Sequence, residues 1–207
     1  MEDPWLFFAK RLLAIGSTGE YFTAHAYDRE RYEEVSAIAR QMLSLLAGSS
    51  VERIASLFPD HATGYATPRV DVRGAVVRND QVLLVRERSD GLWTLPGGYA
   101  ETGLTLAANV LKEIEEEAGI VASVECLLGV RHKASHAYDP DVRDFYKVFF
   151  LCRAAEDVVP TAGLETLDAR FFSANALPPL SRGRTLEKDI HVALARSQSS
   201  DLAAFFD

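Results

Sequence analysis

The sequence predicts a mixed α/β (α+β) fold in which a mixed sheet lies between helices, preceded by a small helical N-terminal domain. Two observations favour this class. Apolar residues in the first 58 positions recur at helical spacing, whereas β-branched segments begin at Arg69. From there the order is strands, helix, strands and helix, which is typical of a sheet covered by helices.

Three helices are predicted before the sheet. Apolar residues in 5–15 recur close to every 3.6 positions, and we expect Gly16 and Ser17 to end that helix. A second helix is expected to begin with Asp28 as its cap, and a short third helix covers 51–58. No internal repeat or low-complexity tract interrupts this order.

We expect two domains joined by a linker. Residues 61–68 are rich in Gly, Thr and Ala, a composition typical of loops. They separate a helical N-terminal domain at 1–60 from a second domain at 69–207. Three helices of this size bury only a small core, so we expect the first domain to dock on the rest of the chain or on a partner chain.

The second domain contains alternating strands and helices. The β-branched segments 70–77 and 81–86 are separated by Asn79 and Asp80, which favour a tight hairpin turn. The helix expected after the Gly-rich loop ends at Gly119, a residue suited to a helix C-terminus. Later strands are expected at 120–131, 145–153 and 170–172, and helices at 105–118 and 185–197.

Composition and charge exclude several classes of protein. The 207 residues are 48% hydrophobic, yet no apolar run reaches the roughly 18 positions that span a bilayer, and the acidic N-terminus is unlike a secretion signal. We therefore expect a cytoplasmic protein. Two cysteines, Cys126 and Cys152, are too few for a disulfide scaffold or a four-cysteine zinc site. A net charge of -8 argues against membranes and extended nucleic acid as partners, and leaves small anionic ligands open.

An acidic stretch in the helix predicted over 105–118 is the most informative feature. Glu113, Glu116 and Glu117 have i, i+3, i+4 spacing, so they share a face separate from the apolar one. Their mutual repulsion and their place near the helix C-terminus both cost stability. Three convergent carboxylates suit a hard divalent cation such as Mg²⁺, whereas most charge runs form a solvated face. The spacing alone leaves both interpretations open.

A glycine pair precedes this helix. Gly97 and Gly98 could let the backbone approach a phosphate or a metal closely, although Pro-Gly-Gly by itself is typical of a simple turn. Gly98 lies 15 residues before Glu113, and this spacing completes a longer pattern.

That pattern resembles the Nudix box: Gly, five residues, Glu, seven residues, and then Arg-Glu-U-x-Glu-Glu-x-Gly-U, where U is aliphatic. The chain departs from it at Leu104, where the family has Glu, and at Lys112, where it has Arg. Lys112 keeps the positive charge but lacks the bidentate fork of Arg, and Leu104 removes one accessory carboxylate. The matching residues are Gly98, Glu113, Ile114, Glu116, Glu117, Gly119 and Ile120.

The resemblance extends to nearly the whole chain. The helical region followed by 65–74 is similar to a Nudix subgroup described as ADP-ribose or CDP-choline pyrophosphatases, whose members commonly carry Leu and Lys at the two departing positions. This resemblance implies a Nudix-type α/β/α sandwich that hydrolyses the pyrophosphate of a nucleoside diphosphate linked to a group X. It also implies Mg²⁺ or Mn²⁺ as cofactor and a homodimer formed through the helical domain.

The resemblance assigns roles to individual residues. It implies Glu113 and Glu117 as main metal ligands, Glu116 as a ligand or a water-orienting base, and the Gly97 carbonyl as a further ligand. In several members a general base comes from a later loop, where Glu165 is the best-placed residue here. An exposed loop carboxylate is the other interpretation of Glu165.

Basic side chains should hold the rest of the diphosphate. Five of them fall in or beside predicted strands that border the box. Most Arg and Lys side chains on strands face solvent, so we expect about two of the five to contact substrate. The five are Arg73, Arg86, Arg131, Lys133 and Lys147.

Two other functions are consistent with a Nudix-like sequence. The first is an enzyme that processes RNA ends, against which the acidic net charge argues because phosphate contacts need basic partners. The second is a non-catalytic ligand sensor whose helices bind a partner or DNA. Sensors of this kind often lose box carboxylates, whereas Glu113, Glu116 and Glu117 are all present. We therefore expect an active hydrolase.

Overall fold

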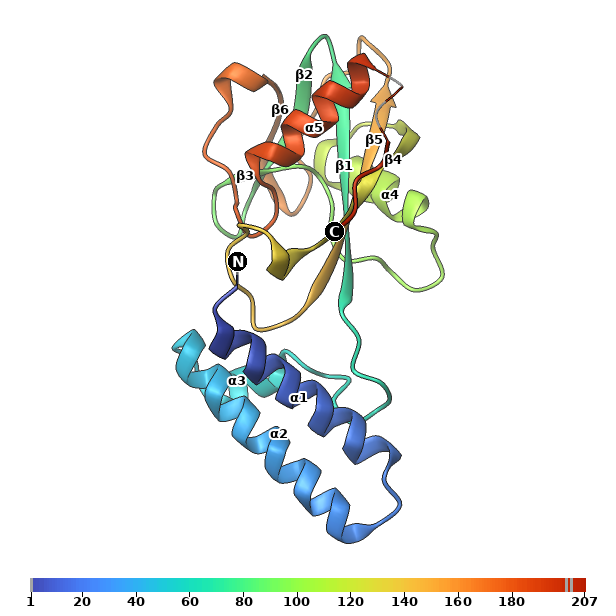
Figure 1. Cartoon of the computed structure of the whole chain (residues 1–207). Helices are drawn as coiled ribbons and strands as arrows, with labels where there is room; N and C mark the ends of the chain where they lie inside the picture. The colour runs from blue at the N-terminus through green and yellow to red at the C-terminus, as the bar shows by residue number, and fades with distance from the viewer. Residues whose placement is uncertain (1, 200, 202) are drawn as a thin grey trace. The chain divides into compact units, whose positions relative to one another are not determined.

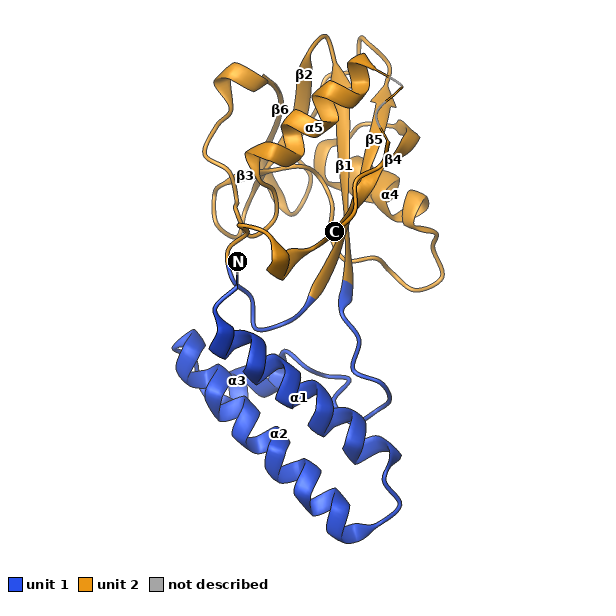
Figure 2. Ribbon diagram, in the orientation of Figure 1, with its two compact units in different colours: residues 1–69, 140–144 blue, residues 70–139, 145–207 orange. Residues whose placement is uncertain are grey.

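A computed structural model describes residues 2–199, 201 and 203–207, which cluster into two compact units (Figures 1 and 2). The first unit comprises 1–69 and 140–144, and the second comprises 70–139 and 145–207. The helices are α1 (Pro4–Phe22), α2 (Ala26–Ala47), α3 (Val51–Ser56), α4 (Leu106–Ala118) and α5 (Glu187–Gln198). The strands are β1 (Arg69–Arg78), β2 (Gln81–Glu87), β3 (Trp93–Thr94), β4 (Ala122–His132), β5 (Phe145–Ala154) and β6 (Thr166–Ser173), with short 3-10 turns at 133–135 and 174–176.

The first unit is a helical hairpin completed by α3. Its core comes from all three helices, with Leu13, Leu43 and Ile54 almost completely buried. Asp3 begins α1 by accepting hydrogen bonds from the backbone N–H groups of Trp5 and Leu6. Such a cap satisfies donors that have no partner inside the helix.

The expected end of α1 at Gly16 and Ser17 is wrong, because the helix continues to Phe22. A Cβ atom at Gly16 would lie 2.3 Å from the Ser36 Oγ of α2. The missing side chain therefore allows the two helices to approach closely, and this packing outweighs the roughly 1 kcal/mol that glycine costs inside a helix. The second expected boundary also moves: α2 begins at Ala26, with Asp28 inside its first turn.

The second unit is built on one sheet. The strand order is β3-β2-β1-β5-β4, and β6 pairs with β2. The predicted hairpin turn between β1 and β2 is confirmed, since Asn79 and Asp80 have φ of 51° and 56° and Arg78 pairs with Gln81. Those positive φ values match the twist of adjacent antiparallel strands.

Helices pack on both faces of this sheet. Val110 and Ile114 of α4 pack in one core cluster with β1 and β2 side chains such as Val72 and Leu83. Ile190 of α5 packs in a second cluster with other residues of the same strands. Figure 1 shows α4 and α5 on either side of the strands. This arrangement confirms the predicted mixed α/β class, with a helical N-terminal region before the sheet.

None of the helices in the described residues is both long enough and apolar enough to cross a bilayer.

Candidate active site

Helix α4 is held in place by its ends and by its apolar face. The Thr105 side chain accepts a hydrogen bond from the Ala108 N–H, and Gly119 ends the helix in the left-handed conformation, with φ of 64°. Val110 and Ile114 are fully buried against the sheet. Because this face is fixed, the orientation of the neighbouring acidic face is fixed as well.

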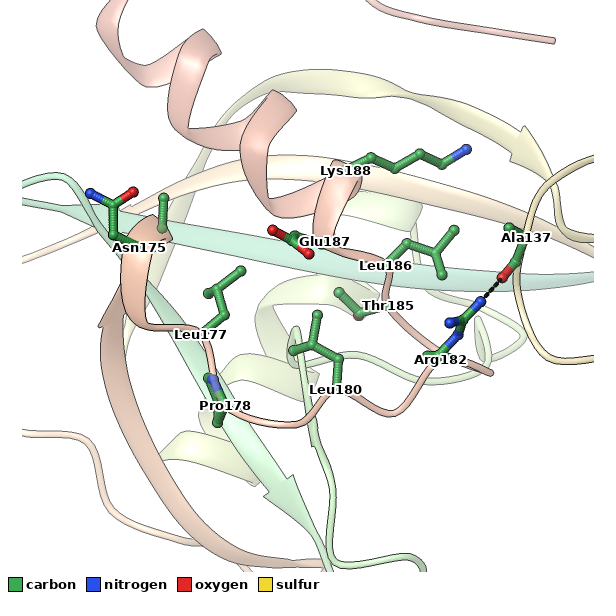
Figure 3. Close-up of a pocket in the computed structure, with 11 residues that line it drawn as sticks. Ala137, Asn175, Leu177, Pro178, Leu180, Arg182, Thr185, Leu186, Glu187 and Lys188 are labelled. Atoms are coloured by element: carbon green, nitrogen blue, oxygen red, sulfur yellow. Dashed lines mark hydrogen bonds between the residues drawn. The ribbon is translucent and has the colours of Figure 1, made fainter.

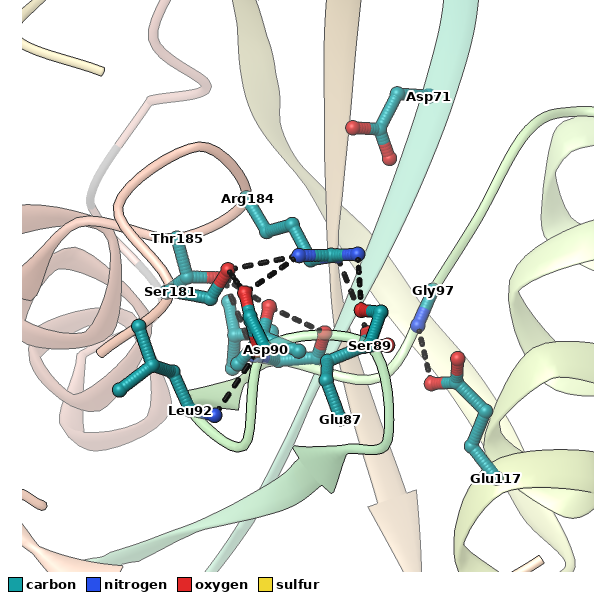
Figure 4. A network of polar contacts seen from close by, with 12 residues as sticks. Asp71, Glu87, Ser89, Asp90, Leu92, Gly97, Glu117, Ser181, Arg184 and Thr185 are labelled. Atoms are coloured by element: carbon teal, nitrogen blue, oxygen red, sulfur yellow. Dashed lines mark hydrogen bonds and ion pairs between the residues drawn. The ribbon is translucent and has the colours of Figure 1, made fainter. Parts of the chain in front are cut away.

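The loop after β3 meets that acidic face at two glycines. A Cβ atom at Gly97, where φ is 146°, would lie 2.0 Å from the Val72 carbonyl oxygen of β1. A Cβ atom at Gly98 would lie 2.5 Å from Glu113 Oε1. The Gly97 N–H donates a hydrogen bond of 3.0 Å to Glu117 Oε2 (Figure 4). Only a loop without side chains can therefore lie between β1 and these two carboxylates.

The carboxylates at this loop are short of positive charge. Burial raises the pKa of Glu117 to about 8, with Glu87 and Glu113 adding to the effect, while Arg73 and the Gly97 N–H oppose it. Burial likewise raises the pKa of Glu113 and of Glu87, and Arg73 opposes both shifts. Oxygen ligands with excess negative charge are what a hard divalent cation requires.

Glu116 lies apart from this pair. Its Oε2 accepts a hydrogen bond of 2.6 Å from Lys112, which also donates to Glu101 at 3.1 Å, and its side chain is 56% exposed. In the part of the chain that the structure describes, no group of three or more His, Cys, Asp or Glu side chains is placed to hold a metal ion. The structure thus brings Glu113 and Glu117 to the loop and leaves Glu116 on Lys112.

The segment that carries Glu165 is joined to the last turn of α4. The Thr161 N–H donates to the Ala118 carbonyl at 2.9 Å, and the Thr166 hydroxyl donates to the Glu117 carbonyl at 2.8 Å. Between them, Glu165 is exposed, and burial followed by several charges, that of Glu165 among them, raises the pKa of Glu113. Residues 161–166 are therefore tied to the last turn of the helix that carries Glu117.

Two of the predicted basic residues share one buried aspartate. Arg73 Nε donates to Asp71 Oδ1 at 2.8 Å and its Nη1 to the Leu95 carbonyl at 3.2 Å, while Lys147 donates to Asp71 Oδ2. Burial by itself would raise the pKa of Asp71, but Arg73 and Lys147 hold it below its usual range. Burial lowers the pKa of Lys147 to about 8. Both side chains are buried, and the charge of Arg73 opposes the rise in the pKa of Glu117.

The other three predicted basic residues contact partners other than Asp71. Arg131 is buried and its Nη1 lies 2.9 Å from Asp189 Oδ1, without hydrogen-bond alignment. Exposed Arg86 donates to the Gly91 carbonyl at 2.8 Å, within the turn between β2 and β3. Half-buried Lys133 lies over the ring of Phe145.

The sequence patterns missed two residues of this site. Glu87 is buried at the end of β2 and forms an ion pair of 3.2 Å with Arg184, which also contacts Asp90 at 2.9 Å (Figure 4). Glu87 follows Leu83 and Val85 at alternate positions, so strand periodicity could have indicated that it faces inward. Nothing in the sequence near Arg184 indicates its partner, which lies 97 residues away.

Comparisons with known proteins match both parts of the chain. The model of the NUDIX domain matches residues 68–192. The model described as the UDP-X-like, N-terminal oligomerisation domain matches residues 3–58.

Individual relatives cover the same range. A Bacillus subtilis protein, YjhB, provisionally named an ADP-ribose pyrophosphatase, is 39% identical over 207 residues, which is 100% of this chain and 99% of that protein. A crystal structure of a UDP-X diphosphatase is 32% identical over 98% of both chains, with a TM-score of 0.62. The crystal structure of an ADP-ribose pyrophosphatase from Streptococcus suis is 35% identical, covers 68% of this chain and 100% of its own, and has a TM-score of 0.62. The chain therefore belongs to the Nudix family and is a Nudix hydrolase.

Proposed function

We propose that this enzyme cleaves the pyrophosphate bond of a nucleoside diphosphate linked to a group X, releasing a nucleoside monophosphate and phosphorylated X. The substrate class is ADP-ribose or a CDP-choline-like compound. One observation carries the proposal: Glu113 and Glu117 meet the glycine loop, with Gly98 leaving room beside Glu113 and Gly97 bonded to Glu117. The names of the Bacillus subtilis and Streptococcus suis relatives support ADP-ribose as the first compound to test.

Mg²⁺ or Mn²⁺ is the proposed cofactor. Glu113 and Glu117 supply hard oxygen ligands with excess negative charge, which fits these ions, and the Gly97 carbonyl would add a third oxygen. Glu116 would join them, as a ligand or a water-orienting base, once it leaves Lys112. A divalent ion held by these residues would neutralise the diphosphate and lower the pKa of a bound water.

Side chains of the protein are proposed to supply the remaining chemistry. Glu165 is proposed to accept the proton of the attacking water, since its segment is bonded to the last turn of α4 and its charge acts on Glu113. Arg73 faces the same carboxylates from β1 and is the basic residue best placed to act on the diphosphate. Lys112 holds Glu116 through a hydrogen bond of 2.6 Å.

A substrate panel tests this function. Purified protein is incubated with Mg²⁺, with Mn²⁺, or with a chelator, and products are separated by chromatography. The panel contains ADP-ribose, CDP-choline, nucleotide sugars, dinucleoside polyphosphates and a short RNA. We expect one diphosphate compound to yield a nucleoside monophosphate with metal and no product with chelator. Absence of hydrolysis across the panel with either metal, in folded protein, would overturn the proposal.

The helical N-terminal region is proposed to form a homodimer. We assign 1–60 to this domain, 61–68 to a linker and 69–207 to the hydrolase domain. Large apolar side chains are exposed along α1 and α2, among them Trp5, Phe8, Phe22, Ile38 and Leu45. Exposed apolar surface of this kind is typical of an interface, and the matched family model is described as an oligomerisation domain.

Sedimentation of the full chain tests the dimer. We expect about twice the 22.8 kDa of one chain for wild type, and a monomer for Phe8→Glu because a charge would be buried in the interface. Val159→Glu, at an exposed valine of the other unit, is the matched control and should remain a dimer. A wild-type monomer at micromolar concentration would contradict the proposal.

A further inference from the structure

A pocket of about 600 Å³ lies between the first turn of α5 and the segment that joins β6 to α5 (Figure 3). All of its lining residues belong to the second unit. Its volume falls in the range of small-molecule sites, roughly 300–1,000 Å³. None of the roles assigned so far uses this pocket.

The walls of the pocket are mixed. Leu177, Pro178, Leu180 and Leu186 supply apolar side chains, and the described lining residues include no aromatic ring. Flat heterocycles can lie between such side chains because their faces are apolar. The amide of Asn175, also in the lining, offers one donor and one acceptor group, which suits the polar edge of a nucleobase.

Two cations stand on one side of the same pocket. Arg182 donates a hydrogen bond of 3.1 Å to the Ala137 carbonyl, and Lys188 lies 2.7 Å from His136 Nδ1. Figure 3 shows Arg182, Lys188 and Ala137 together on this side, opposite Asn175. These cations can serve ribose hydroxyls and phosphate oxygens. The Glu187 carboxylate is in the same lining, and the described lining residues lack the aromatic cage that is typical of choline sites.

The pocket is connected to the candidate active site through a few hydrogen bonds. Thr185 lines the pocket, and its hydroxyl accepts a hydrogen bond of 3.1 Å from the Leu95 N–H. The Leu95 carbonyl accepts a hydrogen bond from Arg73, the residue that acts on Glu117. The chain then continues from Leu95 to the glycine loop, so pocket and loop are held by the same segment.

A second connection between the pocket and the candidate active site involves residues that lie between the lining residues in the sequence. Ser181 and Arg184 alternate with Arg182 and Thr185, and they bind Asp90 through hydrogen bonds of 2.8 and 2.9 Å (Figure 4). Arg184 also pairs with Glu87 beside the catalytic carboxylates. Residues of this loop therefore alternate between lining the pocket and contacting Glu87 and Asp90.

We infer that this pocket holds the nucleoside half of the substrate, with the base between the leucines and Asn175 and the ribose phosphate toward Arg182 and Lys188. The inference rests on the proposed function, because it names the part of that substrate which lies away from the glycine loop. The pocket would then select the nucleoside and would leave the identity of group X unselected.

Binding to the metal-free full chain tests the location without relying on catalysis. Adenosine, cytidine, uridine, ribose 5-phosphate and phosphocholine are titrated by calorimetry into wild type, Leu177→Trp, Asn175→Ala and Val159→Trp. We expect at least one nucleoside to bind wild type and the control variant Val159→Trp equally. Leu177→Trp fills the pocket and should weaken that binding at least tenfold, and Asn175→Ala should weaken it about tenfold. Thermal unfolding of each variant verifies that it is folded. If Leu177→Trp misfolds, the binding of nucleosides to Asn175→Ala decides the test.

Three results would overturn the inference. They are no nucleoside binding at millimolar concentration, equal binding by wild type and both pocket variants, or pocket-dependent binding of ribose 5-phosphate or phosphocholine in place of a nucleoside. These results are separate from failure of the proposed function, which the hydrolysis panel measures. For a hydrolysed substrate, Leu177→Trp should raise KM about tenfold and change kcat much less. A loss of kcat at unchanged KM would contradict the assignment.

Discussion

Asp71 and Glu117 are both buried carboxylates near Arg73, yet their surroundings differ. Asp71, at the start of β1, accepts hydrogen bonds from Arg73 and Lys147, which hold its pKa below the usual range despite burial. Glu117, at the glycine loop, accepts only the Gly97 N–H among the hydrogen bonds seen in the described residues. Burial raises its pKa to about 8.

This difference indicates that the Asp71 charge has a structural role, whereas the Glu117 charge is available to bind a ligand. Asp71 is neutralised within the chain, so a ligand has nothing to add there. At Glu117 burial has removed water and Arg73 offsets the effect only in part, which costs stability unless a ligand brings more positive charge. Buried carboxylates that the chain leaves without a cationic partner are therefore the better indication of a metal site.

Removing Lys147 should have the largest effect and tests the neutralised cluster. Lys147→Met leaves Asp71 buried with Arg73 alone, and we expect the free energy of unfolding to fall by about 3–5 kcal/mol. Denaturant unfolding measures this change, and Asp71→Asn combined with Lys147→Met should recover part of it. A folded, equally stable Lys147→Met variant with a raised KM would instead assign Lys147 to substrate binding.

Replacing Glu117 should have the opposite pattern, with a loss of activity and no loss of stability. Glu117→Gln removes a proposed metal ligand, so we expect kcat/KM to fall at least about 100-fold while the unfolding free energy is unchanged or higher. Glu115→Gln, on the exposed face of the same helix, is the matched control and should retain activity. Wild-type rates in Glu117→Gln would remove the metal-helix assignment.

A smaller effect is expected at the loop itself. In Gly98→Ala the new methyl group would displace the Glu113 carboxylate, 2.5 Å from its Cβ, and we expect a roughly tenfold loss of kcat/KM. Gly64→Ala, where a Cβ meets nothing within 4 Å, should leave the rate unchanged. Full activity in Gly98→Ala would show that Glu113 need not occupy this position.

The smallest effect concerns pH and a second neutralised carboxylate. Burial alone would raise the pKa of Asp90, but the Leu92 N–H, Ser181 and Arg184 lower it overall. A lowered folded pKa stabilises the protein above about pH 4, and this contribution is lost as the pH falls through the folded value. Asp90→Asn should therefore unfold with about 1 kcal/mol less free energy at pH 7, and the difference from wild type should shrink below pH 4. A difference that is constant from pH 7 to 3 would contradict this origin.

Much of the fold follows from local patterns. Helix α4 begins and ends within one residue of the 105–118 expected from apolar spacing and Gly119, and the Asn79-Asp80 turn lies where the strand pattern predicts it. Such elements depend on neighbours only a few positions away. The end of α1 was wrong because Gly16 serves contact with α2, which local propensity does not contain.

The candidate site was likewise predictable only where its residues lie close together in the sequence. Spacing alone placed Glu113, Glu116 and Glu117 on one helix face, and the resemblance to the Nudix box added the glycine loop. Lys112 was expected to steer a neighbouring carboxylate, but the sequence did not indicate that this is Glu116 or that Glu87 faces inward. Those outcomes depend on which side chains compete for each partner once the chain is folded.

The sequence by itself determined the family, the acidic helix, the glycine loop and the hairpin turn, because each is encoded by residues close together in the chain. Tertiary structure decided which charges are neutralised. Lys147 reaches Asp71 across 76 positions, and Arg184 reaches Glu87 across 97. Burial and the partners of each group then set its pKa, so only the folded chain distinguishes Asp71, which is paired with two cations, from Glu117, whose pKa stays raised.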